Sequence, residues 1–355
     1  MTITSRPWLE QLQPYRPGRH APLADGSMAS NESPLGTSPA VVEAVTRAAH
    51  GVHRYPDPLA DPVRDELARL HGVDADQILV GNGSDELIYL LAMAYLAQGG
   101  HAVCADPAYR IDEISTYVVN ANLTRVPLKE WAHDLDTMAE VPADIAYVVN
   151  PHNPTGTVRD PAEIRGFVER SRARLVVVDE AYIDFTDDPE AMTAIPLVRD
   201  GRAVVLRTFS KVHGLAGLRI GYLVGDRDII ATLRKIRAPF SVGMLSQAAA
   251  VAALRDTAYR EQVRAHTLRL REHVVRLVEA AGYQAVPSQA NFVLVVGDEA
   301  ELMDRLARHG VSVRPGSALG VPGTVRISVP SERGLELLAA ALADADHRPT
   351  PVDTP

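Results

Sequence analysis

Cysteine is almost absent from this chain, since Cys104 is the only one among 355 residues. A single cysteine cannot form a disulfide within the chain, and its scarcity is typical of proteins kept in a reducing compartment. Apolar runs of roughly 18 residues, the length that spans a membrane, are also missing. The first twenty residues lack the apolar segment of a secretory signal. We therefore expect a cytoplasmic protein with no membrane partner.

Clustered positive charge is missing as well. The 36 Lys and Arg residues are outnumbered by 45 Asp and Glu residues, which gives a net charge of -9. This balance opposes nucleic-acid binding, which depends on neutralising phosphates. Lysine itself is scarce, because Lys129, Lys211 and Lys235 are the only ones. A lysine-dependent mechanism therefore has few candidates, and an anionic substrate would need a local group of arginines.

Two kinds of binding motif are also not found. No His, Cys and carboxylate residues recur at a metal-binding spacing, so we expect no metal. The glycine-containing segment GNGSDE lacks the Gly-Lys-Ser/Thr ending of a nucleotide-binding P-loop. This argues against a nucleotide-binding protein.

Short apolar runs alternate with helical patterns between residues 39 and 254. The runs are QILV, HAVCA, ADIAYVV, RLVVVD and AVVLR, and the helical patterns include DELIYLLAMAYLA. This alternation predicts an α/β fold with a mainly parallel, seven-stranded-type sheet sandwiched by helices. A long helical stretch then leads into a set of strands and helices typical of a smaller α+β domain. We expect an N-terminal arm over 1–38, a large domain over 39–254, a small domain over 255–346 and a disordered tail over 347–355.

Chemically suggestive residues follow several predicted strands, at the edge where open parallel sheets bind ligands. In GNGSDE, after QILV, the glycines would let a ligand approach the backbone closely. The start of the next helix would offer free N–H groups to a phosphate. The candidate contacts are Gly83, Ser84 and Asp85. A tight turn with Asp85 near an N-cap explains the same segment.

A carboxylate and an amide follow two further strands. Asp179 ends the almost entirely apolar run RLVVVD, where an unpaired charge would be costly. A cationic group should therefore face it. Asn153, in the turn NPHNPTG, could donate an amide hydrogen to a ligand oxygen. The structural alternatives are an N-cap for Asp179 and ordinary turn chemistry for Asn153.

Cationic groups complete the set. The segment TFSKVHGLAGLRIGY places Ser210, Lys211 and Arg219 just after a strand, in surroundings where lysine is seldom found. Arg314 and Arg326 lie on successive short strands of the small domain and could grip an anion bidentately. The alternatives are a lysine that reaches into solvent and arginines at solvated strand edges.

The order of these residues favours one cofactor. A phosphate anchor, an aspartate that pairs with a pyridinium nitrogen, and a lysine that forms an imine are what a protein supplies to pyridoxal 5'-phosphate. Residues 83–85, Asp179 and Lys211 offer these three features along the chain. We therefore expect pyridoxal 5'-phosphate as the cofactor, held by Lys211 as an internal Schiff base.

Over nearly its whole length, the chain resembles the fold-type-I, class I/II aminotransferases, and among them the histidinol-phosphate aminotransferase branch. The motifs that carry the resemblance are YRPG, SNESPLG, RYPDP, GNGSDE, NPHNPTG, VVVDEAY, TFSKVHGLAGLRIGY, SQANF, VRPGS and VRISV. The resemblance implies a pyridoxal-phosphate transaminase that acts by a ping-pong mechanism on a small-molecule amino donor and a 2-oxo acid. Histidinol phosphate and 2-oxoglutarate are the leading pair. It also implies a homodimer with shared active sites.

The resemblance assigns a role to each motif residue. The catalytic residues would be Lys211, Asp179 and Tyr182. The cofactor would contact Gly83, Ser84, Asp85, Tyr109, Asn153, Asp179, Tyr182, Ser210, Lys211 and Arg219, and Tyr55 would reach the cofactor phosphate of the neighbouring subunit. The substrate would be bound by Arg326, Arg314, Tyr15 and Asn31.

One motif departs from the family pattern, because the usual Asn-Glu-Asn-Pro reads NESP here, with Ser33 in third place. This loop lies near the substrate in the family, so the amino donor stays open. The same scaffold could serve an aromatic-amino-acid aminotransferase, a threonine-phosphate decarboxylase or another pyridoxal-phosphate enzyme of specialised metabolism. A cofactor-binding regulator without turnover is the non-catalytic alternative.

Overall fold

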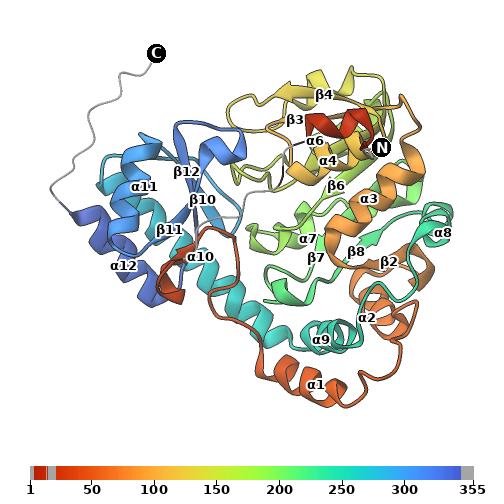
Figure 1. Ribbon diagram of the computed structural model, residues 1–355, viewed down its shortest axis with the longest axis horizontal. Coiled ribbons are helices and arrows are strands. Elements are labelled where there is room, and N and C mark those ends of the chain that lie inside the picture. The colour runs from red at the N-terminus through yellow and green to blue at the C-terminus, as the bar shows by residue number, and fades with distance from the viewer. Residues whose placement is uncertain (1–3, 13, 15–20, 345–355) are drawn as a thin grey trace.

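The computed structural model describes residues 4–12, 14 and 21–344, and its strands form two sheets with helices packed on them (Figure 1). The larger sheet has seven strands in the order β2 (Ile78–Gly81), β8 (Gly221–Val224), β7 (Ala203–Thr208), β6 (Ala173–Asp179), β5 (Ala143–Val149), β3 (His101–Asp106) and β4 (Asn122–Pro127). Strands β3 to β7 are parallel, and β8 is antiparallel to both of its neighbours. The prediction of a mainly parallel α/β sheet is confirmed.

Both faces of the larger sheet are buried, which explains why its central strands are almost uninterrupted apolar runs. Successive residues of β6 point to opposite faces, so that Val176 and Val178 join one core and Val177 joins the other. Helices α1 (Pro39–Ala49), α2 (Asp61–His71), α5 (Leu135–Ala139), α6 (Pro161–Arg170) and α9 (Met244–Arg255) contribute to the first core. Helices α3 (Gly83–Tyr95), α4 (Arg110–Val118) and α8 (Arg227–Ile236) contribute to the second. The short α7 (Pro189–Met192) lies in the connection between β6 and β7.

Capping residues set several helix boundaries. The Ser38 side chain accepts a hydrogen bond from the Val41 amide at the start of α1, where Pro39 occupies the first turn. Asp160 and Glu163 form a capping box at the start of α6. These boundaries therefore follow from local sequence, and they fix where the loops that precede these helices end.

The smaller sheet has the order β1 (Ser27–Met28), β11 (Ser312–Pro315), β12 (Thr324–Ser328), β10 (Phe292–Val296) and β9 (Gln284–Ala285). It packs with α10 (Thr257–Ala280), α11 (Glu299–Arg308) and α12 (Glu332–Ala343) around a separate apolar core. Strand β1 comes from the N-terminal segment and pairs in parallel with β11, a contact that the sequence analysis did not predict. It brings residues 29–31 beside the small sheet.

The predicted boundaries of the arm, the two domains and the tail stay a prediction, and the tail over 347–355 lies outside the described residues. Within the described ranges, no helix has both the length and the apolar character needed to cross a membrane. The same part of the chain contains no group of three or more His, Cys, Asp or Glu side chains arranged to hold a metal ion.

Candidate active site

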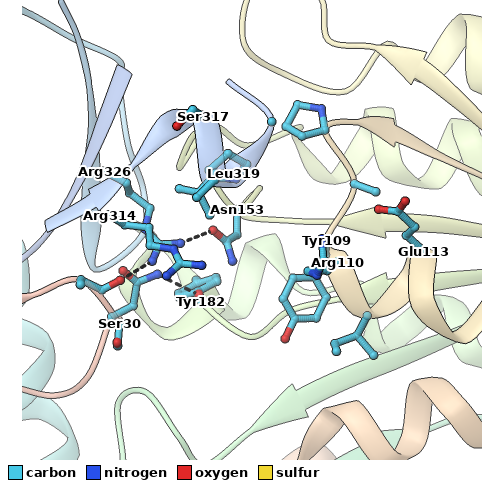
Figure 2. Close-up of a pocket in the computed structure, with 18 of the residues that line it drawn as sticks. Ser30, Tyr109, Arg110, Glu113, Asn153, Tyr182, Arg314, Ser317, Leu319 and Arg326 are labelled. Atoms are coloured by element: carbon cyan, nitrogen blue, oxygen red, sulfur yellow. Dashed lines mark hydrogen bonds between the residues drawn. The ribbon is translucent and has the colours of Figure 1, made fainter. Parts of the chain in front are cut away.

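Two adjoining cavities open at the carboxyl ends of the parallel strands, facing the small sheet. The outer cavity has a volume of ≈ 730 Å³ and the inner one ≈ 230 Å³. Both are lined by Ser30, Asp85, Tyr109, Asn153, Tyr182 and Lys211. Figure 2 shows the outer cavity between Arg314 and Arg326 on one side and the start of α4 on the other. The structure therefore brings most of the predicted site residues to one place.

Lys211 lies in the loop that follows β7, and its side chain reaches the wall shared by the two cavities. Its Nζ donates a hydrogen bond to the Ser30 carbonyl oxygen at 3.5 Å and lies 5.5 Å from the centroid of the Tyr182 ring. No carboxylate forms an ion pair with this amine among the described residues. The amine is therefore placed to react with a ligand in either cavity.

Asp179 is the last residue of β6, and it is 5% exposed. Burial raises the pKa of its carboxyl to about 7, and the nearby Asp85 and Glu180 add to the rise. The Ala181 amide, which donates to Oδ1 at 2.9 Å, and the Lys211 amine act in the opposite direction. A buried carboxyl in this state ionises readily only when a cation lies against it.

The start of α3 forms one wall of the inner cavity. Gly83 has a φ of +78°, and a Cβ there would lie 2.8 Å from Arg219 Nη2, so glycine is required at this turn. Ser84, Asp85, Ser210 and Arg219 line the cavity beside it, whereas Gly83 is not among the lining residues. The helix start leaves backbone N–H groups free for an anion.

The Asp85 carboxylate is already engaged by other groups. It accepts a hydrogen bond from the Tyr109 hydroxyl at 3.0 Å and forms an ion pair with Arg219 at 3.4 Å. An anion in the inner cavity would be repelled by this side chain. If an anion binds here, Asp85 would contribute its backbone N–H, while its carboxylate orients Tyr109 and Arg219.

Two hydrogen bonds fix the polar groups on the floor of the outer cavity. Arg326 Nη1 donates to Asn153 Oδ1 at 2.6 Å, which leaves the Asn153 amide nitrogen to donate to a ligand. Asn31 Nδ2 donates to the Tyr182 hydroxyl at 3.0 Å, which leaves that hydroxyl's own proton available. Asn153 and Tyr182 can thus donate to the same ligand oxygen.

Arg314 and Arg326 are register partners on β11 and β12, and they are 6% and 5% exposed. Both line the outer cavity, and Figure 2 shows their guanidinium groups close to Asn153 and Tyr182. Arg326 also donates to the Ala29 carbonyl at 2.8 Å, so the segment after β1 helps to position it. Two adjacent buried guanidinium groups form a strongly cationic end of the cavity.

Two predicted residues are not part of this cluster. Tyr55 is 81% exposed, does not line either cavity of its own chain, and stacks on Phe240 with ring centroids 4.7 Å apart. Tyr15 lies outside the described residues.

A group of residues opposite the arginine pair was not predicted from the sequence. Arg110 and Glu113 from α4 and Arg125 from β4 line this wall of the outer cavity. Arg110 follows Tyr109 directly, and Glu113 lies three residues later on the same helix face. Helical spacing from Tyr109 could have indicated Arg110 and Glu113. Arg125, by contrast, reaches this wall only because β4 pairs with β3.

The residues of the two cavities fit pyridoxal 5'-phosphate. The free N–H groups at the start of α3, with Ser210 and Arg219, suit its phosphate, and the buried Asp179 needs a cation such as a protonated pyridine nitrogen. Lys211 supplies the amine that such a cofactor requires on the same wall.

Comparison with known proteins gives the same family. The model of the family "Aminotransferase class I and II" matches residues 27–342. The histidinol-phosphate aminotransferase of Akkermansia muciniphila is 41% identical over 330 residues, covering 89% of each protein. That of Halalkalibacterium halodurans is 36% identical over 356 residues, covering 96% of each.

Solved structures agree with this assignment. The crystal structure of histidinol-phosphate aminotransferase from Sinorhizobium meliloti in complex with pyridoxal-5'-phosphate has a TM-score of 0.87 and 28% identity, covering 96% of this chain and 97% of that one. L-threonine-O-3-phosphate decarboxylase from Porphyromonas gingivalis, at 23% identity and a TM-score of 0.80, covers 89% of this chain and 98% of its own, and shows the shared fold alone. Because the family model spans most of the chain and the relatives align over nearly their full lengths, this protein belongs to the class I and II aminotransferases.

Proposed function

We propose that the protein is a pyridoxal-phosphate-dependent histidinol-phosphate aminotransferase that passes the amino group to 2-oxoglutarate. The observation that carries this proposal is the pair of buried arginines, Arg314 and Arg326, in the cavity that Lys211 also lines. A phosphate monoester carries nearly two negative charges and several acceptor oxygens, which suits two guanidinium groups better than a single carboxylate does. The curated relatives described above are named for this activity.

The charge of the whole protein supports an anion site at this position. With a net charge of -9, the surface as a whole repels a phosphorylated substrate. A local cationic site is therefore needed to draw the substrate in, and Arg314 and Arg326 supply it at one end of the cavity. Fold similarity alone does not choose the donor, because one fold hosts many chemistries.

When bound, pyridoxal phosphate supplies an electrophilic carbon and a ring that withdraws electrons from the substrate. Lys211 would hold the cofactor covalently, and its Nζ would accept and return the proton at the substrate Cα. The Asp179 carboxylate would keep the pyridine nitrogen protonated. Tyr109 would stack on the ring, and Asn153 with Tyr182 would donate to its 3-oxygen.

We also propose a cytoplasmic homodimer in which each subunit contributes to the other's site. Tyr55 supports this arrangement, because it is a motif residue that is exposed, lines neither cavity of its own chain and stacks on Phe240. Tyr55→Phe should weaken cofactor binding by about tenfold to a hundredfold, the range expected for one lost hydrogen bond to a charged phosphate. Titration of the cofactor-free protein measures this effect. A monomer in sedimentation analysis, or unchanged cofactor affinity, would contradict the proposal.

The donor preference tests the proposed function most directly. We expect wild type to use histidinol phosphate at least about tenfold better, in kcat/KM, than histidine, phenylalanine or tyrosine, which is ~1.4 kcal/mol of transition-state binding. Arg326→Ala should lower kcat/KM for histidinol phosphate by about tenfold to a hundredfold, because a charge-assisted contact contributes about 1.5–3 kcal/mol. The measurement is formation of glutamate from 2-oxoglutarate with each donor.

Arg333→Ala is the matched control, since Arg333 is an exposed residue of α12 paired with Glu336. It should behave as wild type. A better rate with an aromatic amino acid would overturn histidinol phosphate as the donor but would leave the transaminase intact. Release of carbon dioxide without glutamate would indicate decarboxylation instead.

A further inference from the structure

The wall of the outer cavity opposite Arg314 and Arg326 carries a carboxylate. Glu113 lies in the first turns of α4, and its side chain is 27% exposed. Figure 2 shows its carboxylate beside the cavity, across from the arginine pair. Arg110 and Arg125 line the same wall, so this end of the cavity presents a carboxylate among arginines, whereas the other end presents two arginines.

The Glu113 carboxylate is oriented by Arg125 and keeps capacity to bind a ligand. Arg125 Nη2 donates to its Oε1, and Arg125 also donates to the Tyr117 hydroxyl at 3.4 Å. Within the described residues, Oε2 accepts no hydrogen bond. A carboxylate offers about four lone-pair sites, so Glu113 can accept a further N–H group while Arg125 holds it in place.

The other carboxylates of this cavity are less suited to that role. Asp85 is engaged by Tyr109 and Arg219. Asp106, at the end of β3, is exposed to solvent. Glu113 is thus the lining carboxylate that is partly buried, held by a neighbouring arginine, and still able to accept a hydrogen bond.

The chemistry of this wall discriminates between rings of similar size. An apolar phenyl ring placed against Glu113 would remove water from the carboxylate and return no hydrogen bond, which is unfavourable. A ring that carries an N–H group would replace the lost water with a charge-assisted hydrogen bond. The wall therefore favours a polar, N–H-bearing ring.

We propose that Glu113 determines donor specificity by accepting a hydrogen bond from a ring N–H group on the side chain of the amino donor. This inference rests on the proposed function and refines it. The phosphate of the donor lies at Arg314 and Arg326, its amino group lies near Lys211, and its ring extends to Glu113. Three branches of one substrate thereby meet three chemically different parts of the cavity.

Two donors that differ only in the ring isolate this contact. Histidinol phosphate and phenylalaninol phosphate share the phosphate, the amine and the carbon chain, but only the first has a ring N–H group. The quantity to measure is the ratio of their kcat/KM values, read from the absorbance change of the bound cofactor in the donor half-reaction. We expect a ratio of at least about ten for wild type, the fold-change of one charged hydrogen bond.

Two substitutions weaken the proposed hydrogen bond between Glu113 and the donor ring to different extents. Glu113→Gln keeps an acceptor oxygen but removes the charge, so the ratio should fall to an intermediate value. Glu113→Leu removes the acceptor and makes the wall apolar, so the ratio should fall at least about tenfold, to near or below one. Glu336→Gln removes an exposed carboxylate of α12 that pairs with Arg333, and it should keep the wild-type ratio.

The outcomes separate this inference from the proposed function. A purely structural role for Glu113 would lower both rates together and leave the ratio unchanged, which would overturn the inference. Equal use of the two phosphorylated donors by wild type would also overturn it, while the aminotransferase activity on phosphate esters would stand. If wild type uses neither phosphorylated donor, the proposed function itself fails.

Discussion

Replacing Lys211 by alanine should abolish turnover, with a loss of at least about 10⁴-fold, the upper range for removal of a positioned proton-transfer group. The expected loss is this large because one amine would serve both to attach the cofactor and to move the proton at the substrate Cα. Lys211 is also the one lysine among the residues that line the two cavities. Steady-state assay with the best donor measures the change.

The covalent attachment of the cofactor to Lys211 can also be measured directly. Borohydride treatment should fix the cofactor irreversibly to wild type, which mass spectrometry detects on the peptide containing Lys211. The same treatment should leave Lys211→Ala unlabelled. The scarcity of lysine gives a matched control, since Lys235→Ala removes a lysine of α8 that lines neither cavity. Labelling of Lys211→Ala, or full activity in it, would show that another group holds the cofactor.

Asp179→Asn should lower kcat by about a hundredfold to a thousandfold, or ~3 kcal/mol, the usual effect of removing one preorganised electrostatic partner. Asparagine has the same shape and can still accept the hydrogen bond from the Ala181 amide, so the change isolates the charge. The physical reason is that a neutral partner no longer keeps the pyridine nitrogen protonated. Asp200→Asn, at an exposed position outside both cavities, serves as the control. Activity within tenfold of wild type would make Asp179 a structural residue.

The same variant tests the buried charge in the cofactor-free protein. Burial raises the pKa of Asp179 from its usual 3.8 to about 7, so the folded state favours the protonated carboxyl. The protonated Asp179 carboxyl therefore stabilises the folded state fully below about pH 4, and this contribution is lost as the pH rises through about 7. The loss lowers the free energy of unfolding by up to about 4 kcal/mol. Wild type without cofactor should therefore become less stable than Asp179→Asn as the pH rises toward 8. Denaturant unfolding at several pH values measures this, and parallel stability curves for the two proteins would contradict it.

Bound cofactor should reverse this effect. A protonated pyridine nitrogen supplies the cation that the buried Asp179 carboxylate otherwise lacks, so its charge is no longer costly. The stability gained on cofactor binding at pH 8 should accordingly be larger for wild type than for Asp179→Asn.

The parts of this protein that sequence predicted are those encoded by short segments. The run RLVVVD is apolar because β6 is buried on both faces, and its last residue must emerge at the carboxyl edge of the sheet. Asp179 was recognisable for that reason, and Lys211 and residues 83–85 were recognisable in the same way. Parallel strands bring their ends to one edge, so listing the residues after each strand already gathers most of the residues that line the two cavities.

Tertiary structure decided the contacts between distant segments. Arg326 is held by the Ala29 carbonyl, 297 residues away in the chain, and this contact depends on the pairing of β1 with β11. Strand β1 is only two residues long, too short to produce a periodic pattern. The orientation of Asn153 by Arg326 likewise crosses from the large sheet to the small one.

The sequence by itself determined the fold class and the cofactor chemistry, and it indicated the residues expected to carry that chemistry, because each depends on a buried strand and the few residues that follow it. Tertiary structure alone decided how the two candidate arginines are arranged in the outer cavity and which further groups lie opposite them. The role that we propose for Glu113 depends on Arg125, which β4 places against it, and on the two arginines that the small sheet places across the cavity. Tyr55 lines neither cavity of its own chain and stacks on Phe240, a contact between segments far apart in the sequence. Specificity depends on distances between elements that are far apart in sequence, and packing fixes those distances.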